Sequence, residues 1–250
     1  MENKNEEWIG GKNPVLEVLR SGRDIHKIMI AEGSQKGVMK QIIGLAKERG
    51  VEVRFVPKVK VDKVVPHANQ GVVAQVAAYQ YFELDDLFRA ASEKDEKPFF
   101  IILDELEDPH NLGSIMRTAD SIGAHGIIIP KRRSVSLTQT VAKASTGAIE
   151  YVPVVRVTNI AKTMEELQKR GLWIFGTDAS GSSDYRTMDA DLPLALVIGS
   201  EGRGMSRLVR EKCDFLIHLP MIGKVTSLNA SVAASILLYE VYRKRNPLEQ

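Results

Sequence analysis

Residues 98–245 alternate between short apolar segments and segments with helical spacing, and this alternation constrains the fold more than any other feature. Strands are expected at FFIILDEL (99–106), GIIIP (126–130), VPVVRV (152–157), LWIFGTD (172–178), LPLALVIG (192–199) and DFLIHLP (214–220). Helices are expected over 112–122, 137–145, 159–170 and 228–243. Short apolar strands separated by helices are typical of a parallel sheet covered on both faces. We therefore predict an α/β fold that binds its ligands beyond the carboxyl ends of the strands.

The first 80 residues have the pattern of a smaller α/β unit. Helices are expected over 14–20, 41–50 and 58–65, and strands over 26–31, 51–56 and 71–79. The acidic stretch ELDDLFRAASEKDEKP then ends at Pro98, and it is typical of a solvated helix or linker. The chain is thus predicted to consist of a first domain (1–80), a linker (81–97) and a second domain (98–250).

Composition excludes several classes of protein. Of 250 residues, 44% are hydrophobic and 26% are charged, which argues against disorder. There is neither a long uncharged apolar run nor a signal-peptide pattern, so a cytoplasmic location is expected. The single cysteine excludes an internal disulfide, and the five histidines show no metal-ligand spacing, so no metal is expected. A formal net charge of +2 does not by itself indicate nucleic-acid binding.

The loop after the first strand of the second domain carries the motif DPHNLGSIMRTAD (108–120). Its apolar residues fall at helical spacing, which leaves Arg117 off the buried stripe. One interpretation is structural: Asn111 caps a helix, and Arg117 pairs with Asp120 on the surface. The other is functional, because an amide and a cation at a strand end suit a phosphate or a developing oxyanion.

The second loop, GSEGRGM (199–205), follows the apolar strand LPLALVI. Its glycines are in the order GxxGxG, so it has neither the dinucleotide fingerprint GxGxxG nor a P-loop, and an NAD or ATP site is not supported. Glu201 is a poor neighbour for a phosphate, which favours a cofactor with a positive or neutral portion. A glycine-rich turn with a solvated Glu201 is the alternative.

The third loop lies within HLPMIGKVTSLNASVAAS (218–235) and leads into the last helix. Ser227 or Thr226 is expected to cap that helix, and Asn229 in its first turn can face the same cleft as the other two loops. A fourth stretch, PKRRSVSLTQ (130–139), adds Lys131, Arg132 and Arg133. These three cations form either a solvated basic loop or a phosphate-contacting patch beside the cleft, whose binding would weaken steeply with salt.

Taken in order, DPHNLGSIMRTAD, LVIGSEGRGM and LPMIGKVTSLNASVA closely resemble the three motifs of the SpoU family of RNA ribose 2′-O-methyltransferases. The resemblance covers about residues 98–245, including KASTGAIEYVPVVRV (143–157). The first domain is similar to the family's small RNA-binding domain, which has a ribosomal-protein-like α/β fold. The most similar branch methylates a guanosine ribose of 23S rRNA.

The resemblance implies a parallel-sheet SPOUT-type domain in which the last loops and helix form a deep trefoil knot, a rare topology. It also implies S-adenosylmethionine (S-adenosyl-L-methionine) as cofactor, and a homodimer whose partner subunit helps to complete the active site. The residues that it places around the cofactor are Gly199, Leu219 and Leu228, through their backbone, with Ile198, Met221 and Ser227 nearby.

The family motifs place the catalytic roles on four residues, namely Asn111, Arg117, Glu201 and Asn229. The implied reaction is the in-line transfer of a methyl group to a ribose 2′-oxygen. Because arginine stays protonated in nearly all proteins, we expect Arg117 to hold the adjacent phosphate and to stabilise the forming alkoxide, oriented by Asn111 and Glu201. The proton then passes to phosphate or to water.

Three other functions are compatible with these residues. A tRNA 2′-O-methyltransferase of the same family is the nearest. A non-catalytic RNA-binding or ribosome-assembly factor could use the same scaffold, although the complete set of catalytic candidates argues against it. A nicotinamide-dependent dehydrogenase is the third, and absence of NAD binding would exclude it.

Overall fold

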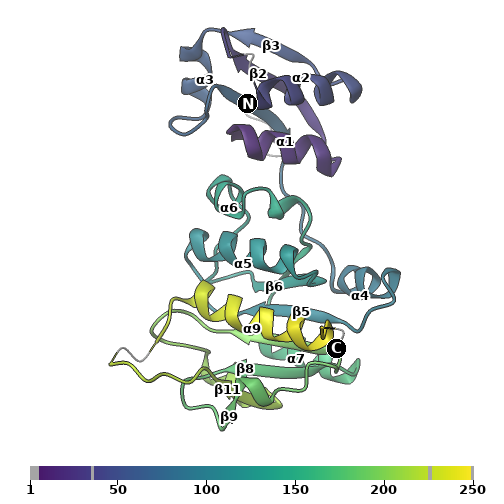
Figure 1. Ribbon diagram of the computed structural model, residues 1–250, viewed down its shortest axis with the longest axis vertical. Helices are drawn as coiled ribbons and strands as arrows, with labels where there is room; N and C mark the ends of the chain where they lie inside the picture. Colours follow the sequence, from purple (N-terminus) through teal and green to yellow (C-terminus); the bar gives the residue numbers. More distant parts are fainter. Residues whose placement is uncertain (1–5, 35–36, 225–226, 249–250) are drawn as a thin grey trace. The chain divides into compact units, whose positions relative to one another are not determined.

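The computed structural model describes residues 6–34, 37–224 and 227–248, which form two compact units (Figure 1). Unit 1 contains the chain up to Gln80 together with Leu137–Tyr151, and unit 2 contains Tyr81–Ser136 and the chain from Val152 onward. Within the described ranges, no helix is long and apolar enough to cross a membrane.

Unit 1 has a four-stranded sheet in the order β1-β4-β2-β3, with β2 and β3 parallel and the other pairs antiparallel. Its strands are β1 (Glu6–Gly10), β2 (Ile25–Ala31), β3 (Val53–Val56) and β4 (Val72–Ala77). Its helices are α1 (Lys12–Ser21), α2 (Val38–Glu48), α3 (Lys58–Val64), α6 (Gln139–Ser145) and the short η1 (Ala148–Glu150). The elements expected within the first 80 residues are confirmed. The additional strand β1 escapes prediction because EEWIG is short and contains only two apolar side chains, so it shows neither an apolar run nor a period.

Unit 2 is built on a seven-stranded sheet in the order β7-β6-β5-β10-β8-β11-β9, and every recorded strand pair is parallel. Its strands are β5 (Phe99–Leu103), β6 (Gly126–Pro130), β7 (Val154–Val157), β8 (Trp173–Thr177), β9 (Ser183–Asp184), β10 (Leu194–Ile198) and β11 (Phe215–His218). Its helices are α4 (Leu84–Glu93), α5 (Pro109–Ser121), α7 (Ile160–Lys169), η2 (Tyr185–Thr187), α8 (Arg207–Glu211) and α9 (Ala230–Arg245). The parallel-sheet α/β prediction is confirmed.

Side chains alternate between the two faces of this sheet, and both faces are buried. Phe100 and Ile102 of β5 pack into one core with residues of α4, α7 and α8. Their neighbours Ile101 and Leu103 are equally buried, and they point to the opposite face because strand side chains alternate. Figure 1 shows α5 and α9 side by side, and a hydrogen bond of 2.9 Å joins Thr118 Oγ1 and Ser235 Oγ between them. Burial on both faces explains why β5 and β10 are continuous apolar runs.

The segment 81–97, which the sequence predicts to be a linker, belongs to unit 2. It contains α4, and Leu87 of that helix is fully buried in the core with Phe100. The side-chain methyl group Cδ2 of Leu87 would come within 2.3 Å of a Cβ atom placed on Gly126. The acidic residues cover only the solvent side of the helix, so a count of charges conceals its buried stripe.

The segment 137–151 lies in unit 1, whereas the sequence predicts it as part of the second domain. Glu150 of this segment and Arg23 form an ion pair of 3.0 Å, with side chains only 4% and 11% exposed. The Arg23 guanidinium also donates to the carbonyl of Ala77, and Ser21 Oγ donates to Glu150 at 3.3 Å. Burial raises the pKa of Glu150, and the charge of Arg23 opposes this shift. A buried pair of this kind holds the segment to the rest of unit 1.

Replacing Arg23 by methionine leaves the Glu150 carboxylate buried without its cation, which costs about 3–5 kcal/mol near pH 7. Because the carboxyl pKa then rises further above its unfolded value, this loss shrinks as the pH falls toward about 4 and Glu150 takes up a proton. Urea unfolding of Arg23→Met in a Trp173→Phe background measures it, since the chain has two tryptophans and Trp8 then reports unit 1 alone. An equal loss of stability at both pH values would contradict the assignment.

Candidate active site

Three loops meet at the carboxyl edge of the sheet in unit 2, after β5, β10 and β11. Asp108 caps α5, because its side chain accepts a hydrogen bond of 2.8 Å from the backbone of His110. Asn111 therefore lies one turn inside the helix and is not the cap that the structural interpretation requires. Its side chain is buried, with the residue only 4% exposed. A buried amide needs partners, and Asn111 finds them on the other two loops.

The carboxylate of Glu201 joins these loops. Its Oε1 atom accepts hydrogen bonds from Asn111 Nδ2 at 3.0 Å, from Asn229 Nδ2, and from the backbone N–H of Ala230 at 3.2 Å. Asn229 Nδ2 also donates to Asn111 Oδ1 at 3.0 Å. Residues 111, 201 and 229, far apart in the chain, thus form one hydrogen-bonded network. The network gives the exposed Glu201 three hydrogen-bond donors on Oε1, which a freely solvated charge in a glycine-rich turn would not have.

Asn229 has a second function as the N-cap of α9. Its Oδ1 atom accepts from the backbone N–H groups of Ser231 at 3.0 Å and Val232 at 3.2 Å, while its amide nitrogen serves the network. The expected cap at Ser227 is therefore wrong, and Thr226 lies outside the described residues. Because Asn229 both caps α9 and donates a hydrogen bond to Glu201, the position of α9 depends on that of Glu201.

The loop that carries Glu201 folds back on itself through backbone contacts. The N–H of Ser200 donates to the carbonyl of Gly204 at 3.0 Å, and the N–H of Gly204 donates to the carbonyl of Ser200 at 2.9 Å. A Cβ atom on Gly199 would lie 2.2 Å from the carbonyl carbon of Gly204, so only glycine fits there. The glycines of GxxGxG thus serve a tight turn that presents Glu201.

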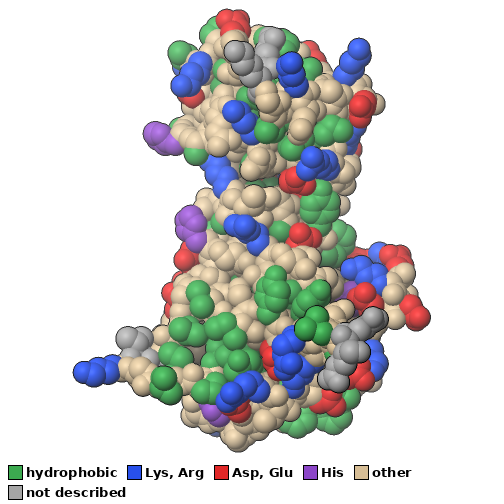
Figure 2. All heavy atoms as spheres, viewed as in Figure 1, with side chains coloured by type: hydrophobic (Ala, Val, Ile, Leu, Met, Phe, Trp, Pro, Cys, Tyr) green, Lys and Arg blue, Asp and Glu red, His purple; other side chains and the backbone are tan. Residues whose placement is uncertain are grey.

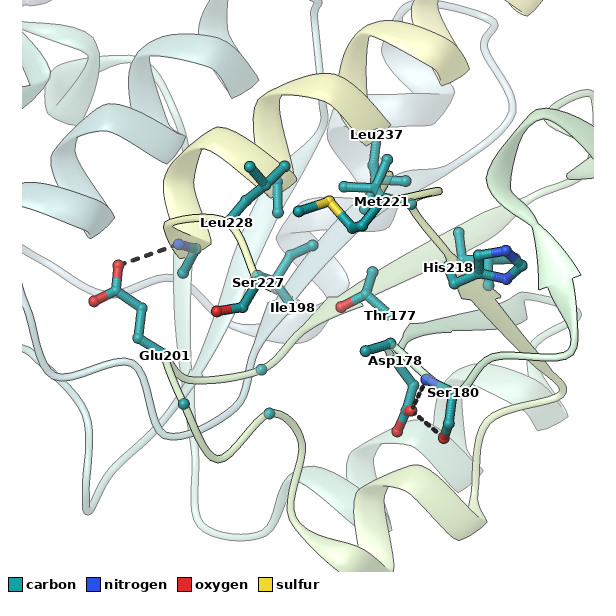
Figure 3. A pocket seen from close by; sticks show the side chains of 18 of the residues that line it. Thr177, Asp178, Ser180, Ile198, Glu201, His218, Met221, Ser227, Leu228 and Leu237 are labelled. Atoms are coloured by element: carbon teal, nitrogen blue, oxygen red, sulfur yellow. Dashed lines mark hydrogen bonds between the residues drawn. The ribbon is translucent and has the colours of Figure 1, made fainter. Parts of the chain in front are cut away.

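A cavity of about 980 Å³ opens beside this network (Figure 3). Its wall contains seven of the residues that the sequence singles out: Ile198, Gly199, Glu201, Leu219, Met221, Ser227 and Leu228. In Figure 3 the side chains of Ile198, Met221 and Leu228 lie close to one another beneath α9, and a dashed line joins Glu201 to the backbone of Ala230. One side of the cavity is therefore apolar, and the carboxylate lies at its border.

Asn111, Arg117 and Asn229 do not line the cavity. The first and third reach its border through Glu201, whereas Arg117 is exposed on α5. The backbone carbonyl of Arg117 accepts a hydrogen bond of 2.7 Å from Ser121 Oγ, and a surface pair between the Arg117 side chain and Asp120 stays the alternative interpretation. Among the described residues, no hydrogen bond or ion pair joins Arg117 to Asn111 or Glu201. An exposed cation of this kind is available to an anionic ligand or to another subunit.

The basic residues Lys131, Arg132 and Arg133 follow β6, next to β5 in the sheet, and all three are exposed. Arg133 forms an ion pair of 3.0 Å with Glu105, which follows β5. The stretch therefore reaches the edge of the sheet that carries the network.

The sequence does not single out the opposite side of the cavity, where Thr177 ends β8 and Asp178 and Ser180 follow it. Asp178 accepts hydrogen bonds from Ser180 Oγ at 2.6 Å and from Arg210 Nε at 2.7 Å. His218 also lines the cavity, and its buried Nδ1 atom has no partner among the described residues. The sequence could have indicated these residues, because TDASG (177–181) lies at the end of a predicted strand, as do the loops of Asn111, Glu201 and Asn229.

Comparisons with known proteins agree with this geometry. The model of the SpoU rRNA methylase family matches residues 98–239. The Bacillus subtilis (strain 168) protein YacO, assigned to the TrmH family of tRNA/rRNA methyltransferases, is 65% identical over 246 residues, or 98% of this chain and 99% of that protein. The chain belongs to the SpoU rRNA methylase family. A second family model, for RNA 2′-O ribose methyltransferase substrate binding, matches residues 8–82 of this SpoU methylase.

Solved structures share the fold of this SpoU methylase. The methyltransferase AviRb from Streptomyces viridochromogenes, crystallised with the cofactor AdoMet, is 27% identical, with a TM-score of 0.81 over 96% of this chain and 91% of that chain. The A. aeolicus TrmH/SpoU tRNA modifying enzyme is 30% identical, with a TM-score of 0.55 over 64% of this chain and 83% of that chain. The family and the parallel-sheet α/β architecture expected from the three motifs are thereby confirmed.

Replacing Asn229 by aspartate separates its two functions. The carboxylate retains the cap on α9, but it loses the amide donor and faces Glu201 with a like charge, so we expect stability to fall by about 1–3 kcal/mol. Asn159→Ala is the matched control, because Asn159 caps α7 through Lys162 N at 3.0 Å, outside the network, and its loss should cost about 1 kcal/mol. Thermal unfolding measures both, and equal stability of Asn229→Asp and the wild type would contradict the network.

Proposed function

We propose that this SpoU methylase transfers a methyl group from S-adenosylmethionine to the 2′-hydroxyl of a guanosine ribose in 23S rRNA. The observation that supports this most strongly is the Asn111–Glu201–Asn229 network at the border of a cavity of about 980 Å³. The network uses the residues on which the three family motifs place their polar roles. It lies where ligands of parallel α/β sheets bind.

The cavity fits S-adenosylmethionine in size and chemistry. Its volume of about 980 Å³ lies near the upper end of small-molecule sites. The peptide groups of Gly199, Leu219 and Leu228 form no backbone hydrogen bond with another described residue, so they are available to a ligand. A purine has apolar faces and hydrogen-bonding edges, which suit these groups and the side chains of Ile198 and Met221. Ser227 completes this wall.

When bound, the cofactor supplies a methyl group activated on a sulfonium sulfur. Glu201, at the border of the cavity, is a favourable neighbour for that positive charge and is fixed by its two asparagines. Arg117 binds the phosphate next to the target ribose and stabilises the 2′-oxygen as it loses its proton to phosphate or water. Because Arg117 is exposed and outside its own cavity, it serves the site of a neighbouring subunit.

The N-terminal unit is proposed to bind the RNA substrate, with the ribosomal-protein-like fold that the resemblance implies. Its match to a substrate-binding model over residues 8–82 supports this role. Lys131, Arg132 and Arg133 add phosphate contacts beside the cavity. Methylation of tRNA is the second candidate, favoured by the naming of YacO as a tRNA/rRNA enzyme. A cytoplasmic location agrees with either substrate.

We also propose that the C-terminal part is knotted. Strand β10 lies between β5 and β8, and β11 returns to the far side of β8 before the chain leads back to α9 beside α5. This order brings the loops after β10 and β11 to one cavity, as the cofactor site of a trefoil knot requires.

The assay for the proposed activity is methyl transfer from labelled S-adenosylmethionine to 23S rRNA and to tRNA from cells lacking this protein. Label at one guanosine ribose of 23S rRNA, mapped by resistance to alkaline cleavage, is the expected result. Arg117→Ala should reduce the rate about 100-fold or more through lost oxyanion stabilisation. Arg89→Ala, at an exposed arginine paired with Asp86 on α4, should retain full activity.

Other outcomes identify the alternatives. Label in tRNA alone would establish the second candidate. Cofactor binding without label in either RNA would contradict the proposed function. Full activity of Arg117→Ala would contradict the role proposed for Arg117. Binding of NAD in place of S-adenosylmethionine would indicate a dehydrogenase, and RNA binding without cofactor binding would indicate an assembly factor.

The exposed apolar side of α9 supports a homodimer, and Figure 2 shows hydrophobic side chains gathered over this helix. Its exposed members are Val232, Ile236, Tyr239 and Tyr242, which are 48%, 38%, 51% and 42% exposed. Small residues beside them let a second backbone approach closely.

Ile236→Asp should convert the protein to a monomer and abolish methyl transfer, because a charge in an apolar interface is strongly unfavourable. Leu208→Asp is the control, since Leu208 is 52% exposed on α8. Analytical ultracentrifugation measures the assembly state, and an unchanged dimer for Ile236→Asp would place the interface elsewhere.

A further inference from the structure

Two arginines share one carboxylate at the ends of three adjacent strands. Glu105 follows β5, Arg133 follows β6 and Arg203 follows β10, and these strands are neighbours in the order β6-β5-β10. Arg133 Nη1 lies 3.0 Å from Glu105 Oε1, and Arg203 Nη1 lies 4.0 Å from Glu105 Oε2. Glu105 thus lies at the end of the middle strand, and one arginine lies at the end of each neighbouring strand.

The exposure of the three side chains differs in a way that suits a binding site. Glu105 is 18% exposed, whereas Arg133 is 76% and Arg203 is 73% exposed. The carboxylate is therefore covered and the two guanidinium groups face solvent. An exposed ion pair contributes little to stability because water and salt screen it. Stability alone does not explain the arrangement.

Backbone strain at two of the three residues argues in the same direction. Glu105 has φ +56° and Arg133 has φ +54°, values that are unfavourable for residues with a Cβ atom. Strained residues of this kind concentrate at ligand sites. Weak ion pairs do not compensate for two such residues, so their conformation is consistent with a ligand that the arginines bind.

The position relative to the active site identifies the ligand. Arg203 lines the cavity and lies on the same short loop as Glu201, two residues away. An RNA strand whose ribose reaches Glu201 therefore carries its neighbouring phosphates past Arg203 and Arg133. Guanidinium groups bind phosphate with paired hydrogen bonds, and a carboxylate behind them fixes their direction.

We propose that Arg133 and Arg203, held by Glu105, bind the RNA phosphates that flank the methylated ribose. The inference rests on the proposed function. It assigns the phosphate contacts to a defined clamp, made of Arg133, Arg203 and Glu105, in place of the basic stretch 131–133 as a whole. Glu107 and Asp108 on the same loop are exposed acids, and Asp108 is engaged as the cap of α5. The negative charges of Glu107 and Asp108 repel RNA phosphates that the two arginines do not contact directly. This repulsion favours one fixed position of the RNA strand along the clamp.

The test measures RNA binding and methyl transfer separately. A fluorescein-labelled single-stranded oligoribonucleotide of mixed sequence is titrated by anisotropy at several salt concentrations. Arg133→Ala and Arg203→Ala should each lower the slope of log K against log salt by about 0.7, which corresponds to about four-fold weaker binding at 0.15 M salt. Both should raise the KM for 23S rRNA by a similar factor, and Arg133→Ala, whose side chain does not line the cavity, should leave the affinity for S-adenosylmethionine unchanged. Arg89→Ala is the control for loss of one exposed, paired arginine.

Glu105→Gly distinguishes the clamp from a structural ion pair. Glycine adopts the observed φ without strain, so the variant should be as stable as the wild type and still show a raised KM for RNA. Unchanged salt slopes and KM values in both arginine variants, with the wild type active on RNA, would overturn the clamp. Reduced salt slopes in a protein that binds RNA but transfers no methyl group would retain the clamp and refute the proposed activity.

Discussion

The carboxylate of Glu201 is the interaction on which the candidate active site depends. It accepts hydrogen bonds from a buried asparagine of α5 and from the first residues of α9, so three loops far apart in the chain share one atom. Although Glu201 is exposed, three donors on its Oε1 atom restrict the orientation of the carboxylate. The loop that carries it also forms one side of the cavity, and the shape of the cavity is therefore tied to the network.

The parallel sheet makes this meeting possible. All carboxyl ends lie on one edge, and β10 enters between β5 and β8, which brings its loop between those of its neighbours. The same order places Arg133, Glu105 and Arg203 in the loops that follow three adjacent strands. The hydrogen-bonded network, the cavity of about 980 Å³ and the pair of exposed arginines thus follow from one topology. They share residues, because Glu201 belongs to both the network and the cavity wall, and Arg203 belongs to both the cavity wall and the arginine pair.

Much of this fold can be predicted from the sequence, because strands buried on both faces are continuous apolar runs and the helices between them show a clear stripe. The sequence does not predict β1, β9 or α8, because these short segments have neither a continuous apolar run nor a clear period. The segment 81–97 was assigned to a linker because its charges outnumber its apolar residues, although Leu87 is core.

The site is predictable to a lesser degree. Strand ends indicate the loops of Asn111, Glu201 and Asn229, and the family resemblance adds their roles. The hydrogen bonds among them depend on side-chain conformations that no spacing encodes. The far wall at Asp178, and the link from Glu105 to Arg203, depend on which strands are neighbours, and the sequence does not specify that order.

A crystal structure of the protein with S-adenosylmethionine tests the central claim most directly. The account predicts the adenosine portion against Ile198, Leu219 and Leu228, with the sulfonium group on the side of Glu201 and the Asn111–Glu201–Asn229 network intact. Cofactor bound elsewhere, or bound here with Glu201 turned out of the network, would contradict it.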